Sequence, residues 1–150
     1  MDRRLSLFLF LALVVGGGLS IGALTSPGEW YAALNKPAFN PPGWLFGPVW
    51  TALYVLIAIA GWRTWRNDPR GRAMRRWRAQ LVLNFAWTPI FFAAHRLGLA
   101  LVVALLLLAV VLAFIGACWR QDRPSAWLFV PYAAWVAFAS LLTASIYLAN

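Results

Sequence analysis

Five apolar stretches, each long enough to cross a bilayer, fill most of this 150-residue chain. A helix rises about 1.5 Å per residue, so about 20 residues span a hydrocarbon core of roughly 30 Å. Charged residues make up only 11% of the sequence, against about a quarter in soluble domains. We therefore predict an all-α integral membrane protein, a single domain over residues 1–150 built as a bundle of five transmembrane helices. The expected helices cover residues 5–24, 44–65, 77–94, 97–119 and 125–148, and a proline-rich loop covers residues 25–43.

The basic residues predict the orientation of these spans. Five crossings place 11 of the 13 Lys and Arg residues on the side of the N-terminus. Lys36 and Arg96 alone fall on the other side. The positive-inside rule then puts the N-terminus in the cytoplasm and the C-terminus outside. The net charge of +9 does not indicate nucleic-acid binding, because the cations cluster at the ends of apolar runs. We read the first run as a retained helix and not a signal peptide, since it is long and four spans follow it.

The ten tryptophans separate by their expected depth. Seven of them fit an interfacial belt, in which the ring lies among headgroups and the indole N–H reaches water. Trp50, Trp87 and Trp135 lie deeper in their spans. A buried indole N–H needs a partner, so we expect these three side chains to face the bundle interior. The belt residues are Trp30, Trp44, Trp62, Trp65, Trp77, Trp119 and Trp127.

The third predicted helix carries a polar and aromatic face. Asn84, Trp87, Thr88 and Phe91 are spaced i, i+3, i+4 and i+7, so they share one side of the helix. An amide in a span is costly unless it meets another polar group. Asn84 therefore either contacts a ligand or joins helices. Pro89 predicts a kink in the same helix.

The fifth predicted helix and the long loop could complete a pocket. Trp135 and Ala139 share a face, with Phe138 beside them, and the small residue either leaves room for a ligand or allows close helix packing. The 25–43 loop is either a plain connector or a lid over the outer ends of the helices, and loops of this length in compact proteins are usually functional. The candidate lid residues are Lys36, Asn40, Pro41 and Pro42.

Several kinds of chemistry have no support in the sequence. The four acidic residues all lie outside the predicted spans, which argues against a pump driven by intramembrane carboxylates. Neither a nucleophilic triad nor a phosphate-binding loop nor a metal-ligand spacing is present, so we predict no metal site. We expect His95 to be an interfacial residue and Cys118 to be a small apolar residue of a helix. Gly18 and Gly22 form a G-x-x-x-G pair that favours close helix contact, within the chain or in a homodimer.

Three segments in order resemble one known family. They are WYAALNKPAFNPPGWLFGPVW, LNFAWTPIFF and LFVPYAAWVAFASLL. The chain resembles the translocator protein family, also called tryptophan-rich sensory proteins or peripheral benzodiazepine receptor homologues, and it looks like a bacterial member. The resemblance covers essentially the whole chain. It implies a five-helix bundle, often a homodimer, that binds porphyrins and other flat apolar ligands.

The resemblance also implies positions for a ligand site. By motif position, the pocket residues would be Tyr31, Trp50, Asn84, Trp87, Trp135 and Ala139. Some bacterial members are linked to light-dependent breakdown of protoporphyrin IX, and the tryptophans matching Trp50 and Trp135 are tied to that chemistry. The cholesterol motif of animal relatives is incomplete here, because no Lys or Arg follows Tyr147, and it is a weak pattern in general.

We therefore expect a membrane protein that binds a tetrapyrrole as sensor, carrier or scavenger, with the macrocycle among Trp50, Trp87, Phe91 and Trp135. Porphyrin would be its ligand, and no obligatory cofactor is predicted. The alternative is an enzyme that degrades protoporphyrin in light, in which Trp50 and Trp135 would be the catalytic residues. A third possibility is that the arginine-rich inner loop docks a partner or anionic lipid. Phe138 and Ala139 complete the predicted ligand-binding set.

Overall fold

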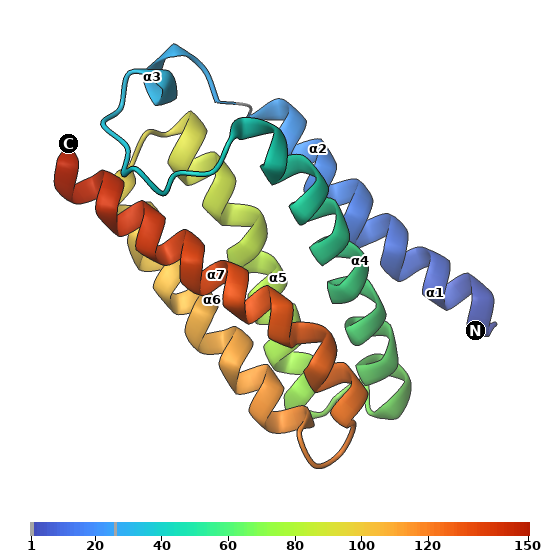
Figure 1. Ribbon diagram of the computed structural model, residues 1–150. Helices are drawn as coiled ribbons and strands as arrows, with labels where there is room; N and C mark the ends of the chain where they lie inside the picture. Colours follow the sequence, from blue (N-terminus) through green and yellow to red (C-terminus); the bar gives the residue numbers. More distant parts are fainter. Residues whose placement is uncertain (1, 26) are drawn as a thin grey trace.

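The computed structural model describes residues 2–25 and 27–150, so Met1 and Ser26, the latter within the predicted lid, lie outside the described residues. Long helical rods lie side by side in a bundle (Figure 1). The loop after the first rod crosses one end of the bundle beside the C-terminus, and the N-terminus lies toward the other end. The segments are α1 (Arg3–Leu11), η1 (Ala12–Gly16), α2 (Gly17–Leu24), α3 (Glu29–Ala32), α4 (Gly43–Asn67), α5 (Arg72–Thr88), η2 (Pro89–Ala93), α6 (Leu97–Cys118) and α7 (Arg123–Ala149).

Four of these rods are long and apolar enough to cross a membrane. They cover residues 3–24, 43–67, 97–118 and 123–149. The rod formed by α5 and η2 is not among them, and its first seven residues contain four arginines. The described residues thus form an all-helical bundle with several apolar spans, as in a multi-pass membrane protein.

The first and third rods are not uniform α-helices. Each contains a π-helical turn, η1 at Ala12–Gly16 and η2 at Pro89–Ala93. A kink was predicted at Pro89, and the structure has a π-helical turn that begins at this proline. Proline has no N–H to donate, so the normal hydrogen-bond ladder cannot continue through it. The turn at η1 follows no proline and was not predicted.

The half of the bundle nearer the N-terminus is tightly packed. The Trp77 indole lies against Gly61 so closely that a Cβ there would overlap the ring. Its Nε1 donates to the Ile57 carbonyl at 2.9 Å. The Trp62 indole donates to the Ser6 hydroxyl at 3.0 Å. Trp62 and Trp77 are therefore buried, and their interpretation as belt residues is wrong. In the case of Trp77 the reason is that α5 begins at Arg72, more than a turn before the predicted start, so that Trp77 lies within the packed part of the helix.

An ion pair joins two rods at the inner end. Arg63 donates to both carboxylate oxygens of Asp122, from Nη2 at 2.7 Å and from Nε at 3.2 Å. The Ser125 hydroxyl also donates to Asp122. Burial by itself would raise the pKa of Asp122, but the hydrogen bonds from Arg63 and Ser125 outweigh it and hold that pKa below its ordinary value.

This lowered pKa predicts a pH-dependent stability. The folded pKa lies below the unfolded value of about 3.9, so the carboxylate stabilises the fold above that pH and the effect is lost as the pH falls through the folded pKa. We expect Asp122→Asn to lower the unfolding midpoint at neutral pH. The cost should stay below about 1 kcal/mol, because 38% of the Arg63 side chain is exposed. Unfolding curves of both proteins should converge below about pH 4; a difference that does not change with pH would contradict this account.

Candidate ligand-binding cavity

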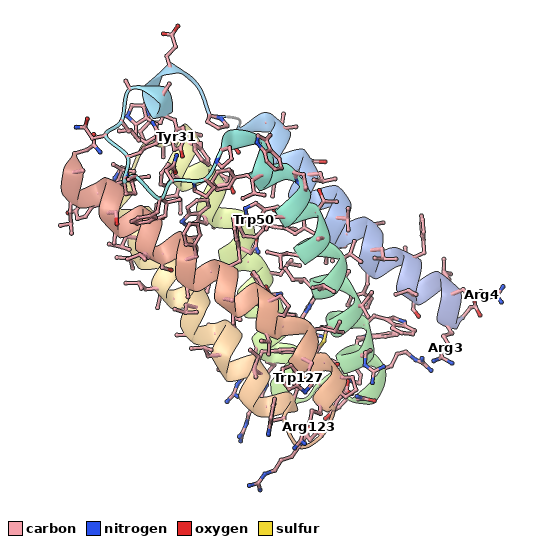
Figure 2. All side chains as sticks on the ribbon, viewed as in Figure 1. Arg3, Arg4, Tyr31, Trp50, Arg123 and Trp127 are labelled. Carbon is pink, nitrogen blue, oxygen red and sulfur yellow. The ribbon has the colours of Figure 1, made fainter. Side chains whose placement is uncertain are left out.

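A cavity of about 420 Å³ lies in the half of the bundle near Tyr31 and Asn40 of the loop. Its walls come from the first rod, the loop, α4, the α5–η2 rod and α7. Trp50, Trp87 and Trp135 all line it. Figure 2 shows Tyr31 in the loop region and Trp50 deeper in the bundle. The predicted site residues that line the cavity are Tyr31, Asn40, Pro41, Trp50, Trp87, Phe91, Trp135, Phe138 and Ala139.

Aromatic rings contact one another around this cavity. The ring centroids of Trp50 and Trp135 lie 6.4 Å apart, and their planes are nearly perpendicular. Phe46 approaches Trp135 edge-on at 5.9 Å. Trp87 contacts Phe91 at 5.1 Å. These pairs come from α4, α7 and the α5–η2 rod. The cavity thus presents aromatic surface on more than one wall, as sites for flat apolar molecules do.

Two of the three indole N–H groups are buried without a hydrogen-bond partner among the described residues. The Nε1 atoms of Trp87 and Trp135 are buried, and no acceptor within the described residues contacts either of them. A buried donor without a partner is costly in an apolar environment. Both atoms are closed off from the open space of the cavity, so an acceptor there could reach them only if the rings turned.

Asn84 does not line the cavity. Its Nδ2 donates to the Tyr132 hydroxyl at 2.6 Å, and that hydroxyl donates to Oε1 of Gln80 at 2.8 Å. All three side chains are buried. Of the two alternatives for Asn84, the geometry favours the joining of helices, here α5 to α7. The prediction missed Gln80, although its spacing of four residues from Asn84 was a signal.

The loop places aromatic side chains over the cavity. The short helix α3 packs Tyr31 against Phe91 and Phe92, with centroids 6.0 and 5.3 Å apart. The Tyr31 hydroxyl lies 3.5 Å from the Asn40 side-chain oxygen that accepts its hydrogen bond. Burial raises the pKa of Tyr31 and the bond to Asn40 lowers it less, so the hydroxyl stays protonated and remains a donor at neutral pH.

His95 anchors the same loop. Its ring stacks on Trp30 with centroids 4.0 Å apart and planes 11° apart. Its φ of 57° is the left-handed conformation that non-glycine residues seldom adopt. His95 was expected to be a plain interfacial residue, and it is exposed just after the α5–η2 rod. Its stacking on Trp30 joins the loop to this rod, and no sequence pattern revealed that contact.

The remaining lid candidates hold the loop in shape. The Lys36 ammonium donates to the carbonyls of Tyr31, Leu34 and Ala32, at 2.8, 3.2 and 3.3 Å. Lys36 therefore stabilises α3 and the turn that follows it, whereas it was predicted as a lid residue over the helix ends. Pro42 does not line the cavity and is the residue before α4, a position where its missing N–H has no cost.

The residue that follows α7, Asn150, is bonded to the loop at Asn35. The Asn35 backbone N–H donates to the Asn150 side chain at 3.1 Å, and the Asn150 amide donates back to the Asn35 carbonyl at 3.0 Å.

Several other cavity residues were not in the predicted site. These are mainly Phe46, Tyr54, Thr88, Leu142 and Thr143.

Comparison with known proteins gives one consistent result. A sequence profile of the TspO/MBR family matches residues 9–148. The tryptophan-rich sensory protein of Cereibacter sphaeroides is 39% identical over 140 residues, which cover 93% of this chain and 89% of that protein. Protein CrtK of Rhodobacter capsulatus is 38% identical over 100% of this chain and 95% of its own length. The human translocator protein is 38% identical over 83% of this chain and 79% of its own length. The chain belongs to the TspO/MBR family, a membrane-protein family, as its resemblance in sequence predicted.

Proposed function

We propose that this protein binds a tetrapyrrole, protoporphyrin IX in the first instance, in the outer cavity. The observation that carries the proposal is that Trp50, Trp87 and Trp135 line one cavity of about 420 Å³ beneath the loop. That volume lies within the roughly 300–1,000 Å³ of small-molecule sites. A flat macrocycle would stack on the aromatic walls, and each such contact adds on the order of 1 kcal/mol beyond burial.

The polar groups of the site fit the same class of ligand. The indole N–H groups of Trp87 and Trp135 are buried without a partner, and they would donate to acceptors on the ligand if binding turned these rings toward it. Arg96 is exposed at the outer end of the bundle and would pair with a propionate. Lys36 is a weaker candidate for that role, since it already donates to three carbonyls. A protein of this kind would act as a sensor, carrier or scavenger of the porphyrin, and the printed names of the relatives include a sensory protein and a translocator protein.

We further propose that the α5–η2 rod is the fifth crossing. It runs with the other long rods in the bundle (Figure 1). With five crossings, 11 of the 13 cationic residues fall on the side of the N-terminus, which the positive-inside rule assigns to the cytoplasm. The C-terminus and the lid would then face outward.

A homodimer also belongs to the proposal. Gly18 is used within the chain, where it packs against the Tyr54 ring. On the exposed side of the first rod, Ala12, Gly16 and Ser20 follow one another at intervals of four residues. Small residues in this spacing let two membrane helices approach closely.

The porphyrin proposal can be tested with paired tryptophan variants. We expect Trp50→Phe combined with Trp135→Phe to weaken protoporphyrin binding about tenfold, because ring area and a hydrogen-bond donor leave the cavity. The matched control is Trp119→Phe with Trp127→Phe, two partly exposed indoles that lie against each other outside the cavity. Binding is measured by porphyrin absorbance in detergent. Equal affinity of the two double variants would count against the cavity.

The contact between Trp50 and Trp135 supports a second candidate, light- and oxygen-dependent degradation of the bound porphyrin. An excited porphyrin beside these indoles could exchange an electron or energy with them. Wild type should then consume protoporphyrin under illumination with oxygen faster than the Trp50→Phe, Trp135→Phe variant, at concentrations where both are saturated. Equal bleaching would leave binding as the function.

A further inference from the structure

A small polar pocket lies at the inner end of the bundle, far from the lid. It has a volume of about 220 Å³ and lies between the start of the first rod and the end of α4. Figure 2 shows Arg3 and Arg4 at the N-terminal tip of the first rod, away from Tyr31 and the lid. The residues around the pocket are Arg3, Trp62, Arg63, Arg66 and Asn67.

The Trp62 indole organises the cations of this pocket. It is buried, and its Nε1 is fixed by the bond to Ser6. The guanidinium carbons of Arg3 and Arg66 lie 5.6 and 4.9 Å from the centre of its ring. Both distances are within the reach of a cation–π interaction. One immobile ring thus brings together two cations from distant parts of the chain, although like charges repel.

The positive charge of the pocket is only partly neutralised. Arg63 is paired with Asp122. Within residues 2–25 and 27–150, neither Arg3 nor Arg66 forms a salt bridge with a carboxylate. The position of Arg66 in the last turn of α4 is favourable for a cation, but the helix end does not require Arg3 beside it. Two guanidinium groups without a carboxylate partner among the described residues therefore line one cavity, and paired guanidinium groups are suited to binding a phosphate.

The surroundings of the pocket identify the source of the phosphate. The pocket lies where two membrane-type helices end, at the start of the 3–24 segment and the end of the 43–67 segment. Both segments are long and apolar enough to cross a bilayer, so their ends lie at the level of the lipid headgroups. Anionic lipids are attracted to clustered basic residues beside membrane helices.

We propose that this pocket binds the phosphate of an anionic phospholipid, with Arg3 and Arg66 as the paired ligands and Trp62 as the residue that positions them. The lipid would join the first rod to α4, its main neighbour at this end. The proposal is independent of porphyrin binding, because the two sites lie at opposite ends of the bundle.

Two double variants with equal loss of charge test the proposal. Arg3→Gln with Arg66→Gln removes the two cationic side chains of the pocket that form no salt bridge among the described residues. Arg4→Gln with Arg70→Gln removes two exposed arginines of the same end that do not line the pocket. Each protein is placed in micelles with phosphatidylglycerol or phosphatidylcholine, and with inorganic phosphate as a third probe. Thermal midpoints and the lipid retained in native mass spectrometry are measured.

We expect phosphatidylglycerol to raise the midpoint of wild type and of the Arg4, Arg70 variant by several degrees over phosphatidylcholine, and to remain bound to both. The Arg3, Arg66 variant should have a somewhat lower midpoint in phosphatidylcholine, because its contacts with Trp62 are lost, and it should lose both the shift on addition of phosphatidylglycerol and the bound lipid. An equal shift in all three proteins, or none in wild type, would overturn the site. An effect of inorganic phosphate as large as that of the lipid would overturn the lipid as its ligand.

Discussion

Ala139→Phe is expected to lower the affinity for protoporphyrin IX by at least about tenfold, or about 1.4 kcal/mol. Ala139 lines the outer cavity on α7, one turn from Trp135. A phenyl ring built there occupies the space that the macrocycle needs. Filling an apolar cavity does not usually destabilise a protein, so the loss of binding should occur without a lower unfolding midpoint. Porphyrin titrations and thermal unfolding in the same detergent measure both quantities.

The control for this substitution lies two residues away. Ala137 is on the same helix but is exposed, away from the cavity. Ala137→Phe adds the same side chain to the outer surface and should bind protoporphyrin as wild type does. If Ala139→Phe also binds with wild-type affinity, the porphyrin does not occupy this cavity.

Gly61→Ala is expected to destabilise the bundle although alanine favours helices. A Cβ at Gly61 would overlap the Trp77 ring, which is only 3% exposed and held by its bond to the Ile57 carbonyl. The indole cannot move without breaking that bond or separating α4 from α5. Overpacking of this kind costs about 1–3 kcal/mol, more than the gain of about 1 kcal/mol in helix propensity. The midpoint of thermal unfolding should fall by several degrees.

A second glycine separates packing from propensity. Gly116 lies in α6, and a Cβ there would meet nothing within 4 Å. Gly116→Ala should therefore leave the midpoint unchanged or raise it slightly, because only the helix propensity changes. Equal effects at Gly61 and Gly116 would show that the Trp77 contact does not limit the approach of α4 and α5.

The sequence predicts which segments are helical better than it predicts where each helix ends and how the helices pack. Runs of apolar residues identify spans because the bilayer sets their length. The start of α5 at Arg72 was missed, since arginines there hid a helix that extends past the apolar run. The same error put Trp77 in the interfacial belt. A tryptophan one turn inside a polar helix end can be a core residue when a glycine opposite makes room, and no local pattern reveals that pairing.

The candidate cavity could be predicted in part for a similar reason. The depth of Trp50, Trp87 and Trp135 in their spans suggested that they face inward, and they line one cavity. The amide of Asn84 could not be assigned, because its partner Tyr132 lies 48 residues away. The lid contacts of Lys36 and His95 depend on the loop path, which the prolines constrain but do not specify. In the sequence, the arginines around Trp62 are explained by membrane topology. Their shared contact with the Trp62 ring depends on the folded structure.

Protection of an engineered thiol would test most directly whether the outer cavity holds the porphyrin. Cys118, the only cysteine, is replaced by alanine, and Ala139→Cys or Ala137→Cys is added to that background. Each protein is labelled with a membrane-permeant maleimide, with and without saturating protoporphyrin IX. We predict that the porphyrin slows labelling at position 139 by at least about tenfold, as expected if nearly all sites are occupied, and leaves position 137 unaffected. Unchanged labelling at position 139 under saturating porphyrin would contradict the account.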